Sequence, residues 1–275
     1  NDDPTLNNVI PDQAATEDSL FSFTFAAGTF GDVDVGDSLT YSASLSSGLA
    51  LPSWLAFDGT SRTFSGTPLN SDVGTLTIEV RADDGNGGTT ATDQFDLVIT
   101  NSNDDPTLNN AIPNQNATED SLFSFTFAAG TFGDVDVGDT LTYSATLSSG
   151  AALPSWLTFN DATRTFSGTP LNADVGTLTI EVSADDGNGG TAATDQFDIV
   201  ITNSNDDPTL NNAIPDQSAT EDSLFSFTFA AGTFGDVDVG DSLTYSASLS
   251  SGAALPSWPT LNDATRTFSG TPLNA

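Results

Sequence analysis

The sequence predicts an all-β protein, built from tandem β-sandwich domains that follow one another as an extended rod. Three observations predict it: an internal repeat of 102 residues, apolar residues at every second position, and turn-forming residues between the apolar runs. A unit of this length has the usual size of an independent β-sandwich domain and is far longer than a solenoid repeat. No window of helical length carries the apolar stripe of a helix.

The repeat is easiest to see in the string NDDPTLNN, which begins at Asn1, Asn103 and Asn205. Successive copies are 102 residues apart, without insertions, and the first two differ at 15 of 102 aligned positions. The predicted domains are repeat 1 at 1–102, repeat 2 at 103–204 and a partial repeat 3 at 205–275, which lacks the last two expected strands. Such near-identity indicates gene duplication in a long parent protein. A start at Asn1 rather than Met indicates a fragment of one.

Four segments of repeat 1 alternate apolar with polar residues, as strands do when one face is buried and the other is wet. We expect these strands at residues 21–25, 39–45, 75–81 and 93–100. Turn formers separate them at Gly28, Gly36, Pro52, 66–68 and 83–88. Short strands broken by turns at this spacing are typical of a β-sandwich.

Trp54 recurs at the same place in each copy, as Trp156 and Trp258. A repeated aromatic of this kind is predicted to plug the core of each domain, with a ligand platform as the alternative. In repeat 3 the next residue is Pro259, where repeat 2 has Leu157. Proline cannot donate a hydrogen bond to a sheet, so we expect an edge strand or a loop there.

The chain carries 38 acidic residues and only four cations, all arginines, for a formal net charge of −34. It contains no Cys, His or Lys, which excludes disulfides, thiolate zinc sites, imidazole bases, Schiff-base lysines and P-loop lysines. A polyanion is repelled by nucleic-acid phosphates and by anionic lipid surfaces, and no stretch is apolar enough to insert into a membrane. We therefore expect the charged partners to be cations.

Nine of the 15 acids of repeat 1 lie in four short loops, where like charges destabilise a domain unless something neutralises them. These acids are Asp2, Asp3, Glu17, Asp18, Asp32, Asp34, Asp37, Asp83 and Asp84. Carboxylates, Asn amides and backbone carbonyls are the oxygen ligands that Ca²⁺ takes. The alternative is an acidic surface that serves solubility. Such a surface would spread its acids over the outward strand faces, which here are mostly Ser and Thr.

Two longer stretches of repeat 1 carry a resemblance to a known family. LPSWLAFDGTSRTFSGTP and DVGTLTIEVRADDGNGG resemble the dystroglycan-type cadherin-like repeats, also described as Ig-like tandem repeats, of large adhesin-type bacterial surface proteins. The residues that occur in the family's order are Trp54, Phe64, Gly66, Pro68, Gly74 and Asp84. The resemblance covers the whole chain and implies tandem Ig-like or cadherin-like β-sandwich domains.

The wider cadherin pattern is visible in the segments 16–18, 32–34, 82–85 and 101–106, the last of which is similar to the cadherin interdomain linker. In cadherins this pattern implies calcium between successive domains. For the first junction it implies the ligands Glu17, Asn103, Asp104, Asp105 (through nearby backbone carbonyls), Asp134, Asp136 and Asp186. For the second junction it implies Glu119, Asn205, Asp206, Asp207, Asp236 and Asp238.

The chain departs from the cadherin pattern at two places. Asn101 stands where the linker pattern has its first Asp, and the Asp-Arg-Glu motif is absent, with Asp72 only a loose substitute. Fewer anionic ligands imply fewer or weaker calcium ions at each junction than in vertebrate cadherins.

The leading functional hypothesis is a structural segment of a long secreted or cell-surface protein, an adhesin stalk or an extracellular filament whose interdomain junctions are stiffened by calcium. One alternative is a filament subunit that polymerises by exchanging strands with copies of itself, which would complete repeat 3. Another is a multivalent module that binds surface carbohydrate or a like repeat on another cell. An enzyme with two carboxylates is disfavoured, because the same acid pairs recur in each copy and no other catalytic side-chain type accompanies them.

Overall fold

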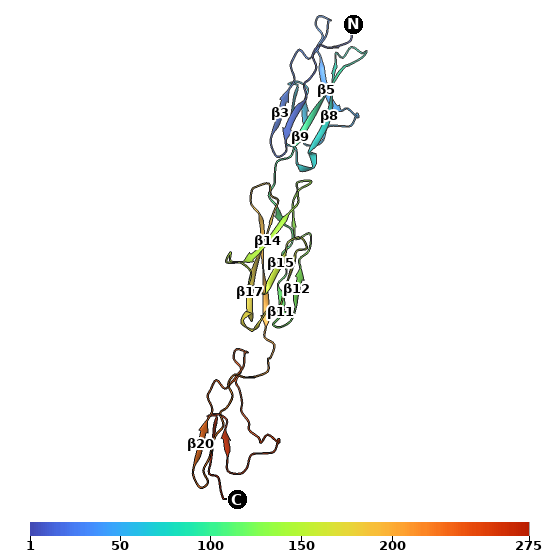
Figure 1. Cartoon of the computed structure of the whole chain (residues 1–275). Helices are drawn as coiled ribbons and strands as arrows, with labels where there is room; N and C mark the ends of the chain where they lie inside the picture. The colour runs from blue at the N-terminus through green and yellow to red at the C-terminus, as the bar shows by residue number, and fades with distance from the viewer. Residues whose placement is uncertain (275) are drawn as a thin grey trace. The chain divides into compact units, whose positions relative to one another are not determined.

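The computed structural model describes residues 1–274, and it is built almost entirely of strands and loops (Figure 1). The backbone divides into two compact units. The first contains residues 1–111, 129–144 and 183–195, and the second contains 112–128, 145–182 and 196–275. The first unit therefore includes the whole of repeat 1. The architecture confirms the all-β class that the alternating sequence predicts.

Repeat 1 forms nine strands and one short 3₁₀ turn. They are β1 (Thr5–Leu6), β2 (Gln13–Thr16), β3 (Phe21–Thr24), β4 (Phe30–Gly31), β5 (Thr40–Leu45), β6 (Ala56–Asp58), β7 (Thr63–Gly66), η1 (Asn70–Asp72), β8 (Gly74–Asp83) and β9 (Ala91–Thr100). One sheet has the order β2-β9-β8-β5 and the other β3-β7-β6, with β1 and β4 paired apart from them. All pairs are antiparallel except β2 with β9, which run in parallel.

The core of repeat 1 lies between its two sheets. On β8, Ile78, Val80 and Ala82 are fully buried, while the residues between them are polar, as the period of two predicts. Phe64 of β7 meets Phe95 of β9 edge to face, with ring centroids 5.5 Å apart. Because these two strands belong to different sheets, the aromatic contact joins the layers of the sandwich.

Trp54 packs against this core, which confirms the prediction that it plugs the domain. A β-carbon added at Gly66, at the end of β7, would overlap the carbonyl oxygen of Trp54. The same overlap occurs at Gly168 with Trp156 and at Gly270 with Trp258. The glycine of the repeated SGTP segment is therefore required because the tryptophan backbone lies directly against it.

Repeat 2 forms the same set of elements. They are β10 (Thr107–Leu108), β11 (Gln115–Thr118), β12 (Phe123–Thr126), β13 (Phe132–Gly133), β14 (Thr142–Leu147), β15 (Leu157–Asn160), β16 (Thr165–Gly168), η2 (Asn172–Asp174), β17 (Gly176–Asp185) and β18 (Ala193–Thr202). The sheet orders are β11-β18-β17-β14, β12-β16-β15 and β10-β13, and β11 again runs parallel to β18.

Repeat 3 keeps only part of this set. Its strands are β19 (Thr209–Leu210), β20 (Phe225–Thr228), β21 (Phe234–Gly235), β22 (Thr260–Asn262) and β23 (Thr267–Gly270), in the orders β20-β23-β22 and β19-β21. The strand β22 is an edge strand that begins directly after Pro259, which confirms the expectation for that segment.

The residues of repeat 3 that correspond to β2 and β5 are 217–220 and 244–249, and neither segment is a strand. In repeat 1 those two strands pair only with β9 and β8, the hairpin formed by residues 74–100. Ile214 is 39% exposed, whereas the equivalent Ile10 is 3% exposed. A hollow of about 260 Å³, lined in part by Phe229, Tyr245 and Phe268, lies in repeat 3. The β8–β9 hairpin thus organises the four-stranded sheet of a repeat.

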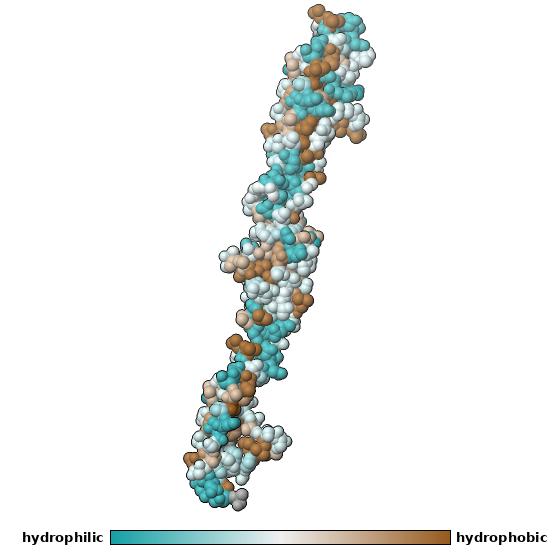
Figure 2. All heavy atoms as spheres, in the orientation of Figure 1, coloured by the Kyte–Doolittle hydropathy of each residue, from teal (hydrophilic) through white to brown (hydrophobic). Residues whose placement is uncertain are grey.

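Hydrophobic residues on the face seen in Figure 2 form separate groups between hydrophilic and weakly polar ones. A leucine that recurs in each copy, as Leu20, Leu122 and Leu224, has 76%, 78% and 79% of its surface exposed. Within residues 1–274, no helix has the length and apolar character needed to cross a bilayer.

We predict that Gly66→Ala destabilises repeat 1 by about 3 kcal/mol, because the new methyl group must displace the backbone of Trp54. Thermal unfolding of the 275-residue chain, followed by calorimetry, measures the decrease in the temperature at which repeat 1 unfolds. Gly28→Ala is the control, since a β-carbon there meets nothing within 4 Å. An equal effect of the two substitutions would show that the contact with Trp54 is unimportant.

Candidate metal centres at the repeat junctions

The parallel pairing of β2 with β9 brings Glu17 to the linker that leaves repeat 1. Glu17 follows β2 directly, and its N–H donates to the carbonyl of Thr100 at the end of β9 (3.1 Å). The carboxylate is fully buried, and Oε1 accepts a hydrogen bond from the N–H of Ser102 (2.8 Å). The other oxygen, Oε2, is buried without a protein partner. A buried carboxylate oxygen in this state requires a cation or another donor to offset its desolvation.

Glu119 repeats this arrangement at the end of β11. It is fully buried, its Oε1 accepts the N–H of Ser204 (2.6 Å), and its Oε2 has no partner. Both glutamates therefore hold the backbone of the linker with one oxygen and leave the second oxygen free to bind a ligand.

The first junction is organised around the carboxylate of Asp136, which is 5% exposed. Its Oδ2 accepts the N–H of Asp104 in the linker (2.8 Å), and its Oδ1 accepts Nδ2 of Asn70 in η1 (2.9 Å). The N–H of Asp136 donates to Oδ1 of Asp134 (2.9 Å). All four residues lie in the same compact unit. A single carboxylate therefore joins the turn before the linker, the linker itself and the loop after it.

The second junction has the same residues in a slightly different arrangement. Oδ2 of Asp238 accepts the N–H of Asp206 (2.7 Å), and the N–H of Asp238 donates to Oδ1 of Asp236 (3.1 Å). Nδ2 of Asn172 bonds to Oδ2 of Asp206 (2.8 Å), so Oδ1 of Asp238 is left buried without a partner. Carboxylate oxygens of Glu119, Asp206 and Asp238 lie within 4.8 Å of one another.

Three further groups of carboxylates have oxygens within 4.8 Å of one another. They are Asp134 with Asp136 and Asp139, Asp236 with Asp238 and Asp241, and Asp32 with Asp37 and Asp84. Oδ2 of Asp134 and Oδ2 of Asp32 are buried without partners. Carboxylates this close repel one another unless a positive charge lies between them.

Three further predicted residues, Asn103, Asp186 and Asn205, make hydrogen bonds with or within the linkers. Oδ2 of Asp186 accepts Nδ2 of Asn103 (2.9 Å), and the backbone of Asn188 donates to its Oδ1 (2.9 Å). These hydrogen bonds, the backbone one first, lower the pKa of Asp186 below the ordinary value. Asn205 donates to the carbonyl of Asp206 (3.0 Å).

Asp105 and Asp207 differ from the other predicted residues. Oδ1 of Asp105 accepts the N–H of Thr191 (2.9 Å), so its carboxylate binds a loop of its own repeat. Asp207 is exposed. The structure therefore groups six of the predicted carboxylates, those of Glu119, Asp134, Asp136, Asp206, Asp236 and Asp238. The side chains of Asp105 and Asp207 lie outside these groups.

Sequence reasoning missed Asn70 and Asn172 and named Asp72 instead. Oδ2 of Asp72 accepts the N–H of Leu69 (3.0 Å), which closes the turn η1 on itself and uses the carboxylate locally. The asparagine two residues earlier is the side chain that reaches the junction. Because the three copies are nearly identical everywhere, repetition of this asparagine carries no special signal in the sequence.

The donor set at both junctions fits calcium. All donors are carboxylate, amide or backbone oxygens, which hard cations prefer. Buried carboxylate oxygens without partners occur in both clusters. A calcium ion would be held at the second junction by Glu119, Asp206 and Asp238, whose carboxylate oxygens lie within 4.8 Å of one another. The equivalent residues of the first junction are Glu17, Asp104 and Asp136, and there the grouped oxygens are those of Asp134, Asp136 and Asp139.

The sheets and junctions define a protein of tandem Ig-like domains, and comparison with known families agrees. The chain belongs to the He_PIG family, described as "Putative Ig domain", whose model matches residues 3–100, 105–202 and 207–275. A comparison with curated protein sequences finds no match.

Among solved structures, the chain is similar to three repeats (EC22-24) of mouse cadherin-23. The identity is 16%, the TM-score is 0.58, and the match covers 100% of this chain and 90% of that one. At this identity the likeness concerns the fold. The chain is thus an array of Ig-like repeats whose fold resembles that of cadherin extracellular domains.

Two other solved structures show weaker likeness. Human protocadherin-24 EC1-2 matches with 16% identity and a TM-score of 0.46, over 72% of this chain and 98% of that one. An endo-fucoidan hydrolase of glycoside hydrolase family 107 matches with 23% identity and a TM-score of 0.33, over 97% of this chain. This chain spans only 39% of the length of that hydrolase.

We predict that Asn103→Ala raises the pKa of Asp186 toward the ordinary aspartate value, because it removes a donor that favours the charged form. In the native chain this lowered pKa stabilises the fold above about pH 4, and the stabilisation is lost as the pH falls through the lowered value. Carboxyl-carbon NMR titration measures the change.

The control for this measurement is Asp58, whose pKa is lowered by its own hydrogen bond from the Ser61 hydroxyl. Its midpoint should stay unchanged in the Asn103 variant. If Asp186 also keeps its midpoint, the hydrogen bond between Asn103 and Asp186 contributes nothing in solution.

Proposed function

We propose that this chain is a structural segment of a long extracellular or cell-surface protein, and that its interdomain junctions bind calcium and become stiffer as a result. The observation that carries the proposal is the pair of fully buried glutamates, Glu17 and Glu119, each with one oxygen on the linker backbone and one without a partner. A hard cation beside the free oxygen would satisfy it and would neutralise the neighbouring aspartates.

Stiffening would follow from where the ligands come from. At the second junction Glu119 precedes the linker by many residues, Asp206 belongs to the linker, and Asp238 lies in the loop after it. An ion that binds all three favours one geometry of the linker by mass action. At a free concentration ten times the dissociation constant, the ordered geometry gains about 1.4 kcal/mol.

An extracellular location agrees with the calcium affinity that is expected of such sites. Calcium sites of extracellular modules commonly have dissociation constants of about 10⁻⁴ to 10⁻³ M, which suits calcium levels outside cells. A structural role also agrees with the composition, because the chain has no Lys, His or Cys and the same acids recur in each copy. We therefore propose no catalytic activity for this segment.

We predict that Glu17→Gln weakens calcium binding at the first junction about tenfold, since it removes one charged ligand and keeps the size of the side chain. Calorimetric titration of the full chain with calcium measures the affinity and the number of sites. Glu119→Gln should have the same effect at the second junction.

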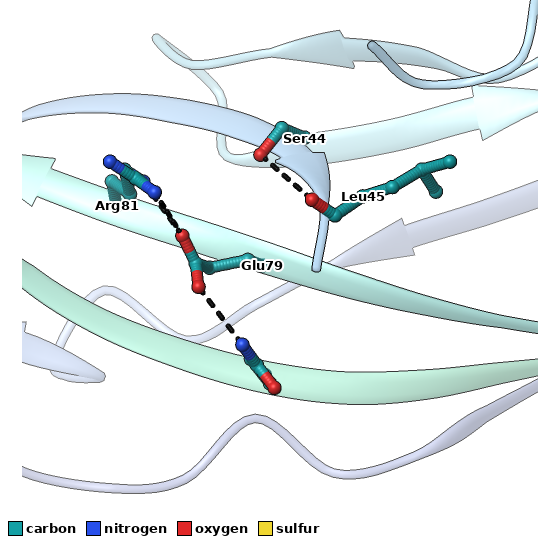
Figure 3. Close-up of polar contacts among 5 residues, drawn as sticks. Ser44, Leu45, Glu79 and Arg81 are labelled. Carbon is teal, nitrogen blue, oxygen red and sulfur yellow. Dashed lines mark hydrogen bonds and ion pairs between the residues drawn. The ribbon is translucent and has the colours of Figure 1, made fainter. Parts of the chain in front are cut away.

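The matched control is Glu79→Gln, which removes the same single charge. Glu79 lies on the face of the sheet, where it pairs with Arg81 (2.6 Å) and accepts a hydrogen bond from Gln94 (2.9 Å) (Figure 3). Its loss should leave calcium binding unchanged. Absence of saturable binding at millimolar calcium in the native chain would contradict the proposed function itself. An equal loss of calcium affinity in Glu17→Gln and in Glu79→Gln would contradict the assignment of the ligands.

A further inference from the structure

The turn η1 presents Asn70 to the first junction in a fixed position. Its ends are closed by two hydrogen bonds, from the N–H of Leu69 to Oδ2 of Asp72 (3.0 Å) and from the N–H of Asp72 to the carbonyl of Leu69 (2.7 Å). The preceding Pro68 carbonyl accepts the N–H of Asp18 (2.9 Å), next to the buried Glu17. The turn is therefore tied to the same end of repeat 1 as the glutamate.

The amides of Asn70 and Asn172 use different acceptors, although the surrounding sequences are nearly the same. Asn70 donates to Oδ1 of Asp136, in the loop after the linker, and Asn172 donates to Oδ2 of Asp206, in the linker. When the amide is on the linker, the matching loop oxygen, Oδ1 of Asp238, is buried without a partner. The amide at this position therefore has two possible acceptors, the linker aspartate and the loop aspartate. At the second junction their carboxylate oxygens, those of Asp206 and Asp238, lie within 4.8 Å of each other.

We infer that these asparagines form an amide clasp, defined as Asn70 at the first junction and Asn172 at the second, which couples each turn to the following acidic cluster without any metal ion. The clasp does not rest on the proposed calcium sites. The amide donates to the loop carboxylate at the first junction and to the linker carboxylate at the second, so either arrangement gives a direct contact between the turn and the acidic cluster.

The chemistry of the side chain explains why an amide suits this position. An Asp would add a negative charge to a cluster of carboxylates and repel them. A Lys or Arg would place a permanent positive charge where a cation would bind. A neutral amide donates hydrogen bonds to a carboxylate and is easily displaced, because it carries no charge of its own. An Asn therefore holds the acidic loop in the ion-free protein and leaves the carboxylates able to take a cation.

The test uses the full chain in a calcium-free buffer with a chelator. Asn70→Leu removes the donor and keeps a side chain of similar size, and Ser71→Ala is the matched control on the same turn. Exchange of the Asp104 amide, which donates to the other oxygen of Asp136, is followed by mass spectrometry of a peptide that reaches Asn114. Residue 114 distinguishes this peptide from its near-identical counterpart, which has Asp216.

We expect exchange at Asp104 to become about fivefold faster in Asn70→Leu, the change that corresponds to one lost hydrogen bond of about 1 kcal/mol. Asn70→Asp should accelerate it further because of repulsion, and Ser71→Ala should leave it unchanged. In an Asp136→Asn background, Asn70→Leu should have much less effect, because the acceptor is already altered.

The distance between two spin labels, one on each side of the linker, is a second measurement. It would not change if Asn70 affected only its own turn. The chain contains no cysteine, so labels attach only at Thr92→Cys and Ser144→Cys, two exposed positions on opposite sides of the linker. The distance distribution should broaden in Asn70→Leu and stay as it is in Ser71→Ala. Unchanged exchange and distances in Asn70→Leu would overturn the clasp, as would equal changes in both variants. Neither result depends on whether the native chain binds calcium.

Discussion

The arrangement of each junction depends on the parallel pairing of β2 with β9. Two parallel strands end at the same edge of their sheet, so the residue after β2 meets the residues after β9. That residue is Glu17, and the segment after β9 is the linker to the next repeat. The pairing therefore places a buried carboxylate on the backbone at the point where one repeat ends (2.8 Å from Glu17 Oε1 to the N–H of Ser102). The acidic loop of the next repeat then completes the cluster.

The two junctions show that nearly identical sequences support more than one hydrogen-bond arrangement. In both, the loop aspartate accepts the N–H of the linker aspartate through Oδ2, at 2.8 Å for Asp136 and 2.7 Å for Asp238. The asparagine amide is the part that changes its acceptor. The fixed contact comes from backbone geometry, while the variable one comes from a side chain with free rotation about its last bond. Each junction therefore has one hydrogen bond that is the same in both copies, from the linker N–H to the loop aspartate, and one that differs, from the asparagine amide.

The sequence was sufficient to predict the strands that bury one face, because alternation of large apolar residues is a local pattern. The segments that became β3, β5, β8 and β9 are of this kind. The strand β2, Gln13–Thr16, was not predicted, since its sequence QAAT contains no large apolar residue and becomes a strand only through pairing with β9. Asn70 was missed for a similar reason, because its partner lies 66 residues away. The motif residues were predictable by resemblance, whereas contacts made only in the folded chain were not.

The dependence of the four-stranded sheet on its last hairpin has a consequence for how such a chain is made. Residues 13–16 and 40–45 of a repeat leave the ribosome long before residues 74–100, so they wait without partners until the hairpin is synthesised. The neighbouring repeat offers a hairpin that differs at only a few positions, and it can pair with the wrong sheet. Order of synthesis then protects the array, because the first repeat closes around its own hairpin before the next one emerges.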